Sequence, residues 1–123
     1  MIRAAMPHFV LEISDNVLEQ LDTQAFFDQV HSIAMRFGVF DLQNLKSRII
    51  RHTEYRVGAR GSNSAFIYLA VALLAGRSLD LRQALGKELT SLLSDTFARS
   101  KTELQCSITC EVREINSATH FKG

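Results

Sequence analysis

The chain has 123 residues, of which 46% are hydrophobic and 22% are charged. A chain of this length and composition is expected to fold as one domain around one hydrophobic core, which excludes a disordered protein. The formal net charge is only +1, so the sequence lacks the broad positive surface by which proteins bind nucleic acids or anionic membranes.

The first half of the chain predicts a strand, a helix and a second strand. Residues 8–13 are apolar and β-prone and precede the turn-forming residues 14–16, which predicts a strand. Residues 23–37 carry apolar side chains at a period of 3.6 and are followed by Gly38, a pattern typical of a capped helix. Residues 46–57 mix apolar and basic side chains, which indicates a strand with one solvent-exposed face.

The second half repeats this order. Residues 65–74 are apolar at nearly every position, which favours a central strand covered on both faces, although periodicity alone also allows a helix. Residues 79–97 follow Ser78, a suitable N-cap, and repeat leucine at helical spacing. Residues 105–115 alternate apolar and polar side chains, which predicts a half-buried strand.

The predicted order is therefore βαββαβ, an α+β two-layer sandwich with a pseudo-twofold repeat of two βαβ units. Both crossover helices would lie on one face of the sheet. The other face then needs a cover, which small domains usually obtain by forming oligomers. The number of subunits does not follow from this pattern.

The cysteine spacing and the lack of long apolar segments indicate the cellular compartment in which the protein is expected. Cys106 and Cys110 lie four positions apart in a predicted strand, roughly 13 Å at about 3.3 Å per residue, too far apart for a disulfide bond. They share a strand face with Ile108 and Val112, so we expect them to fill the core. We find no membrane-length apolar run and no signal-peptide core, and we therefore expect a cytoplasmic protein.

Pro7 is a candidate catalytic residue, because it is the only proline and follows Met6. If the mature chain begins at Pro7, residues 1–6 are a leader or an early assigned start, and residues 7–123 form the single domain. A free amine there would titrate near 7.7 to 8.0 before any perturbation and could both accept and return a proton near neutral pH. The alternative is a proline that only begins a strand, where its missing N–H is harmless.

Basic residues at the ends of predicted elements are candidates for binding anions. Lys46 and Arg48 lie at the start of the second predicted strand, and Arg77 lies just before the second predicted helix. Guanidinium groups at such positions can hold a carboxylate, although ordinary solvated charge is the alternative. No metal site is expected, because we interpret three histidines as structural or exposed: His31, His52 and His120.

Three segments carry a family resemblance: MPHFVLEISDN from Met6, LKSRI from Leu45 and AGRSLDLRQALG from Ala75. With them the sequence, from about Met6 to Lys122, resembles the 5-carboxymethyl-2-hydroxymuconate isomerase family of the tautomerase superfamily. The resemblance implies a trimer whose sheets form the inner wall. It also implies an isomerase without metal or cofactor that moves a proton between oxygen and carbon of an unsaturated 2-hydroxy dicarboxylate during aromatic-acid degradation.

The resemblance also implies roles for the candidate residues. Pro7 would be the base, Arg77 would bind a carboxylate and polarise the developing 2-oxo acid, and Lys46 and Arg48 would bind substrate. Lys46 replaces a family arginine, which keeps the charge but loses the planar fork. With residues 1–6 attached, Pro7 is an amide without a basic lone pair. A non-catalytic oligomeric dicarboxylate-binding module is then the alternative, and a ferredoxin-like regulatory domain is a third hypothesis.

Overall fold

The computed structural model describes residues 7–59, 61 and 63–123, so the predicted leader lies outside the described residues. Short 3-10 helices at Leu42–Asn44 and Ser117–Thr119 accompany the main elements. In chain order these are β1 (His8–Ser14), α1 (Thr23–Met35), β2 (Lys46–His52), β3 (Ser64–Leu74), α2 (Leu79–Thr96), α3 (Ala98–Glu103) and β4 (Gln105–Ile115). The predicted α+β fold and its βαββαβ order are confirmed.

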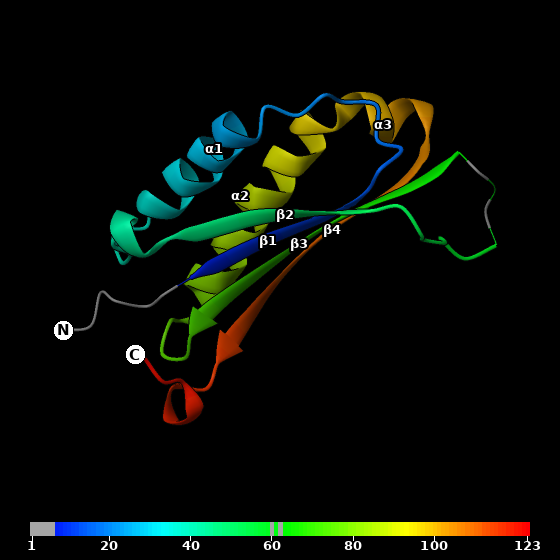
Figure 1. Cartoon of the computed structure of the whole chain (residues 1–123). Coiled ribbons are helices and arrows are strands. Elements are labelled where there is room, and N and C mark those ends of the chain that lie inside the picture. Colours follow the sequence, from blue (N-terminus) through cyan, green and yellow to red (C-terminus); the bar gives the residue numbers. More distant parts are fainter. Residues whose placement is uncertain (1–6, 60, 62) are drawn as a thin grey trace.

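The four strands form one sheet in the order β2-β1-β3-β4 (Figure 1). Within each βαβ unit the strands are parallel, β1 with β2 and β3 with β4. The two units meet at the centre through the antiparallel pair β1–β3. This arrangement is the predicted pseudo-twofold repeat, and it brings the starts of β1 and β2 to the end of the sheet where β3 and β4 finish.

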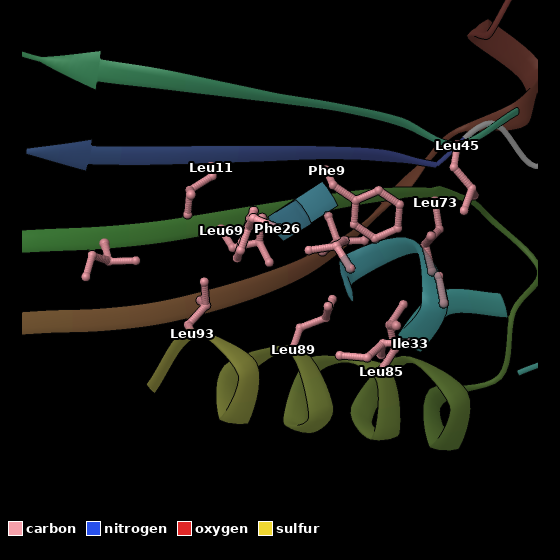
Figure 2. Packing of buried hydrophobic residues seen from close by; sticks show 14 of the residues in the cluster. Phe9, Leu11, Phe26, Ile33, Leu45, Leu69, Leu73, Leu85, Leu89 and Leu93 are labelled. Carbon is pink, nitrogen blue, oxygen red and sulfur yellow. The ribbon is translucent and has the colours of Figure 1, made fainter. Parts of the chain in front are cut away.

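The helices cover one face of the sheet (Figure 1). Leu85, Leu89 and Leu93 repeat every fourth residue on α2, so they share the helix face that points at the sheet, as Figure 2 shows. They meet alternate residues of β1 and β3, among them Phe9 and Leu69, and all of these side chains are at most 1% exposed. Burying each such side chain contributes about 1.5 to 3 kcal/mol.

The opposite face of the sheet is open in the single subunit. Every second residue of β3, such as Tyr68 and Ala70, is only partly buried, because α1 and α2 pack on the other face of the sheet. The expectation that residues 65–74 are covered on both faces is therefore wrong for one subunit, although β3 is central as predicted. The same face carries His8 and Val10 of β1, which alternate with the buried Phe9.

Several predicted boundaries also need correction. The strand predicted for residues 46–57 ends at His52, because its neighbour β1 ends at the paired Ser14 and edge strand β2 then has no partner. The helix predicted for residues 23–37 ends at Met35. The helix predicted for residues 79–97 ends at Thr96, where Phe97 adopts φ −107° and ψ 31°, and the separate helix α3 follows.

The two cysteines are free and pack against the hydrophobic core, as predicted. Burial raises the pKa of the Cys110 thiol to about 11, which keeps it protonated and unreactive at neutral pH. In the described part of the chain, no helix is both long enough and apolar enough to span a membrane.

Candidate active site

Pro7 lies at the end of the sheet where β1 and β2 begin. Its side chain is buried, and its carbonyl oxygen accepts a hydrogen bond of 3.2 Å from the backbone N–H of Lys46. The parallel register that pairs His8 with Lys46 fixes this contact. Pro7 and the start of β2 are therefore neighbours, although 38 positions separate Lys46 from His8 in the chain.

Arg77 lies in the turn between β3 and α2 at the same end of the sheet. Gly76 turns the chain there with φ 119°, a conformation that favours glycine, and Ser78 caps α2 by accepting from the Leu81 N–H at 3.1 Å. The Arg77 guanidinium donates to the Val39 carbonyl at 3.2 Å and lies 5.7 Å from the centroid of the buried Phe40 ring. These contacts fix the cation against the helix-covered side of the sheet.

Lys46 and Arg48 project from the open face, because they alternate on β2 and pair in register with His8 and Val10. Both are exposed. Lys46 Nζ donates to the Asn44 carbonyl at 3.2 Å, and Arg48 Nη1 lies 3.1 Å from Nδ1 of His8. Among the described residues no carboxylate forms an ion pair with either cation, which leaves their charge available to an anionic ligand.

The pKa of His8 reflects the positive charges at the start of β1 and β2. Burial lowers the pKa of His8 below its usual 6.5, and the charges of Arg48, Lys46 and His120 lower it further. The sequence does not mark His8 as a site residue, and it indicates only a structural or exposed role for His120. The sequence carried no signal for this grouping, because it depends on strand register and on where the C-terminal segment lies.

The comparisons with known proteins decide the family. A model of the family described as 5-carboxymethyl-2-hydroxymuconate isomerase matches residues 7–123. The chain belongs to this family.

Two relatives agree with this membership. The chain is 29% identical over 117 residues to a 5-carboxymethyl-2-hydroxymuconate Delta-isomerase of Escherichia coli, which covers 95% of this chain and 93% of that protein. The crystal structure of a 5-carboxymethyl-2-hydroxymuconate isomerase from Deinococcus radiodurans R1 superposes with a TM-score of 0.89 at 25% identity, covering 98% of this chain and 90% of the other. A more distant neighbour, described as a fused 4-OT symmetric trimer, shares the fold with a TM-score of 0.73 at 14% identity, covering 94% and 91% of the two chains.

Family membership confirms the resemblance drawn from the sequence. The protein is an isomerase of the tautomerase type, and the non-catalytic binding module and the ferredoxin-like regulatory domain are not favoured. The family match begins at Pro7.

In this isomerase the predicted site residues share one end of the sheet but not one side of it. Lys46 and Arg48 gather with His8 on the open face. Arg77 packs on Phe40 beside the helix-covered core. In one subunit Lys46 and Arg48 therefore lie on the same face of β2, whereas Arg77 contacts Val39 and Phe40.

A groove of about 480 Å³ lies elsewhere, between α1 and α2. The ion pair between Arg36 and Glu88 joins its two walls. None of the candidate residues lines it: Pro7, Lys46, Arg48 and Arg77 all lie outside it. This groove is therefore not part of the candidate active site.

Proposed function

We propose that this protein catalyses the enol-to-keto isomerisation of an unsaturated 2-hydroxy dicarboxylate of the 5-carboxymethyl-2-hydroxymuconate type in aromatic-acid degradation. We further propose that its mature chain begins at Pro7 and that the reaction needs no cofactor. The observation that carries the proposal is the position of Pro7: it is the first residue of the family match and lies buried beside a cluster of cations.

In this mechanism the free amine of Pro7 is the base. Burial of Pro7 and the nearby positive charges of Lys46 and Arg48 both disfavour the protonated amine, so its pKa should lie below the ordinary 7.7 to 8.0. The nitrogen takes the proton of the enol hydroxyl, the C–O bond becomes a carbonyl, and the electron pair moves to the far carbon of the conjugated system. The resulting Pro7 ammonium returns the same proton to that carbon.

The arginines and the lysine bind the two ends of the substrate. Arg77 holds the carboxylate next to the reacting oxygen and stabilises the charge that develops there. Lys46 and Arg48 bind the distant carboxylate. Since Arg77 lies on the other side of the sheet end from these two cations, we propose that a neighbouring subunit completes each pocket.

We propose a homotrimer in which the open sheet faces form the inner wall. The uncovered, partly apolar face of β1 and β3 supports this assembly, and a neighbour of the same fold is described as a symmetric trimer. Light scattering coupled to size-exclusion chromatography tests it: a mass of three chains is expected, and a monomer would contradict it.

The free thiols of Cys106 and Cys110 favour a reducing compartment, and we propose that the protein is located in the cytoplasm.

The test of the function compares two forms of the protein, one that begins at Pro7 and one that retains residues 1–6. Turnover of a 2-hydroxymuconate-type enol acid is followed by the loss of its ultraviolet absorbance. We expect turnover only from the form that begins at Pro7, because an amide nitrogen cannot accept the proton. Equal turnover by both forms, at equal circular dichroism, would remove Pro7 from the mechanism.

A further inference from the structure

We infer that His8 is a positioning residue that orients Arg48 for the bidentate binding of a substrate carboxylate. The inference deepens the proposed function and rests on it. Its basis is the 3.1 Å contact between Arg48 Nη1 and His8 Nδ1, which joins neighbouring strands β1 and β2 on the open face.

The contact fixes the tautomer of His8. A guanidinium can only donate hydrogen bonds, so Nδ1 must accept, and the neutral ring carries its proton on Nε2. The lowered pKa of His8 agrees with a neutral ring. The ionisable groups that face it are Lys46 and Arg48 from β2 and His120 from the C-terminal segment, while its partner on β3 is Ala72.

Arg48 is particularly important for binding a carboxylate in this chain, because the other cation on the same face of β2 is Lys46. The Lys46 ammonium is a point charge that already donates to the Asn44 carbonyl at 3.2 Å. Of these two cations, only Arg48 can present two parallel N–H groups to one carboxylate. His8 contacts one guanidinium nitrogen and leaves other donors free, so it restricts the orientation of the fork without occupying all of it.

Acidification separates this role from simple attraction. Protonated His8 would present a donor at Nδ1 and a like charge, and both would break its contact with Arg48. If His8 only added charge, a dianion would bind more tightly as His8 becomes protonated. The positioning role predicts the opposite, a weaker affinity as the pH falls below 6.5 toward the lowered pKa of His8.

The test is calorimetric titration of the full chain with cis,cis-muconate, a dicarboxylate that lacks the 2-hydroxyl group and is not isomerised. At pH 7.5 we expect His8→Ala and Arg48→Lys each to weaken binding about tenfold, and the double variant to lose little more than either. His8→Asn keeps an acceptor for Arg48 and should retain most of the affinity. His52→Asn is the matched control, because it alters a contact between β1 and β2, to Glu12, at the opposite end of the same strands.

Nitrogen NMR measures the chemical shifts of the two His8 ring nitrogens. These shifts should not depend on Arg48 if the role of His8 were purely structural. We expect an unprotonated Nδ1 and a protonated Nε2, with the Nδ1 signal changing in Arg48→Lys. The inference is overturned if the wild-type chain does not bind the dicarboxylate, if the two single losses add in the double variant, or if affinity rises as the pH falls from 7.5 to 5.5.

The proposed function can fail separately. In the form that begins at Pro7, His8→Ala should raise KM about tenfold and leave kcat within about twofold. Unchanged KM with normal turnover would reject the role of His8 and keep the isomerase. Dicarboxylate binding that depends on His8, without turnover of any enol acid, would keep the role of His8 in orienting Arg48 and reject the proposed reaction.

Discussion

The two ends of the sheet differ in how their polar side chains are used. At the end that begins with Pro7, Lys46 and Arg48 are exposed cations without a carboxylate partner among the described residues. At the far end, the Ser14 hydroxyl accepts from the Phe66 N–H at 3.0 Å.

Buried Ser100 belongs to the far end as well. Its hydroxyl accepts from the Leu18 N–H at 2.8 Å and donates to Glu19, whose carboxylate also accepts from the Ser100 N–H at 3.0 Å. Ser14 and Ser100 at the far end hold loops in place, whereas we propose that Lys46 and Arg48 at the Pro7 end bind a ligand. Substitutions should therefore reduce turnover at one end and stability at the other.

The largest effect in this comparison is expected at Arg77. Arg77→Ala should lower kcat/KM about 100-fold, because it removes the cation that we propose to stabilise the developing charge. It should lower the free energy of unfolding by about 1 to 2 kcal/mol, because it also removes the hydrogen bond to Val39 and the packing on Phe40. Arg77→Lys should recover part of the activity. Steady-state kinetics and urea unfolding of the same preparations measure kcat/KM and the free energy of unfolding. If the loss of stability were large enough to explain the lost activity, the claim that this end of the sheet serves activity would be contradicted.

Ser100→Ala should have the reverse effect. It leaves the Leu18 N–H and the Glu19 carboxylate without their hydroxyl partner, so the free energy of unfolding should fall by about 1 to 3 kcal/mol, with turnover at 25 °C unchanged. Ser91→Ala, at an exposed position of α2, is the matched control and should shift stability by less than about 0.5 kcal/mol. Reduced turnover in a folded Ser100→Ala protein would break the distinction between the two ends.

Lys46→Arg should produce a smaller gain at the Pro7 end. It restores the planar fork that the family resemblance places there, and KM for the dicarboxylate should fall about two- to fivefold with little change in kcat. An increased KM would mean that the pocket of this protein is shaped for the lysine.

His31 offers a further test of the comparison between the two ends of the sheet. It lies near the Pro7 end but is not one of the candidate site residues. Its Nε2 lies 2.7 Å from the Ser47 hydroxyl, its ring lies against Phe9, and burial lowers its pKa below 6.5. The unfolded chain therefore binds the proton first, and the free energy of unfolding should decrease as the pH falls below about 6.5. Above that pH this group should have no effect. In urea unfolding between pH 7.5 and 5.5, His31→Gln should flatten this dependence, and an unchanged slope would exclude His31 as its source.

Periodicity in the sequence was sufficient for the order of elements, because the leucines of α2 and the alternating residues of β4 reflect the faces that they bury. It could not place the end of β2, which depends on where β1 stops, nor α3, which follows a single residue outside helical geometry.

The candidate site was only partly predictable for the same reason. Its cations lie at element ends that the sequence marks, but the contacts of Arg48 with His8 and of His52 with Glu12 each join residues 40 positions apart. Only the register of a parallel strand pair brings such residues together. The packing of Arg77 on Phe40 likewise requires the loop after α1 to meet the turn after β3.

The central claim is that the Pro7 nitrogen is the base, and the most direct measurement is its titration by nitrogen NMR in the form that begins at Pro7. We expect its pKa to lie below the ordinary 7.7 to 8.0 and to coincide with the acidic limb of the pH profile of kcat/KM. A pKa at or above 8, or an acidic limb that follows a different group, would contradict the mechanism.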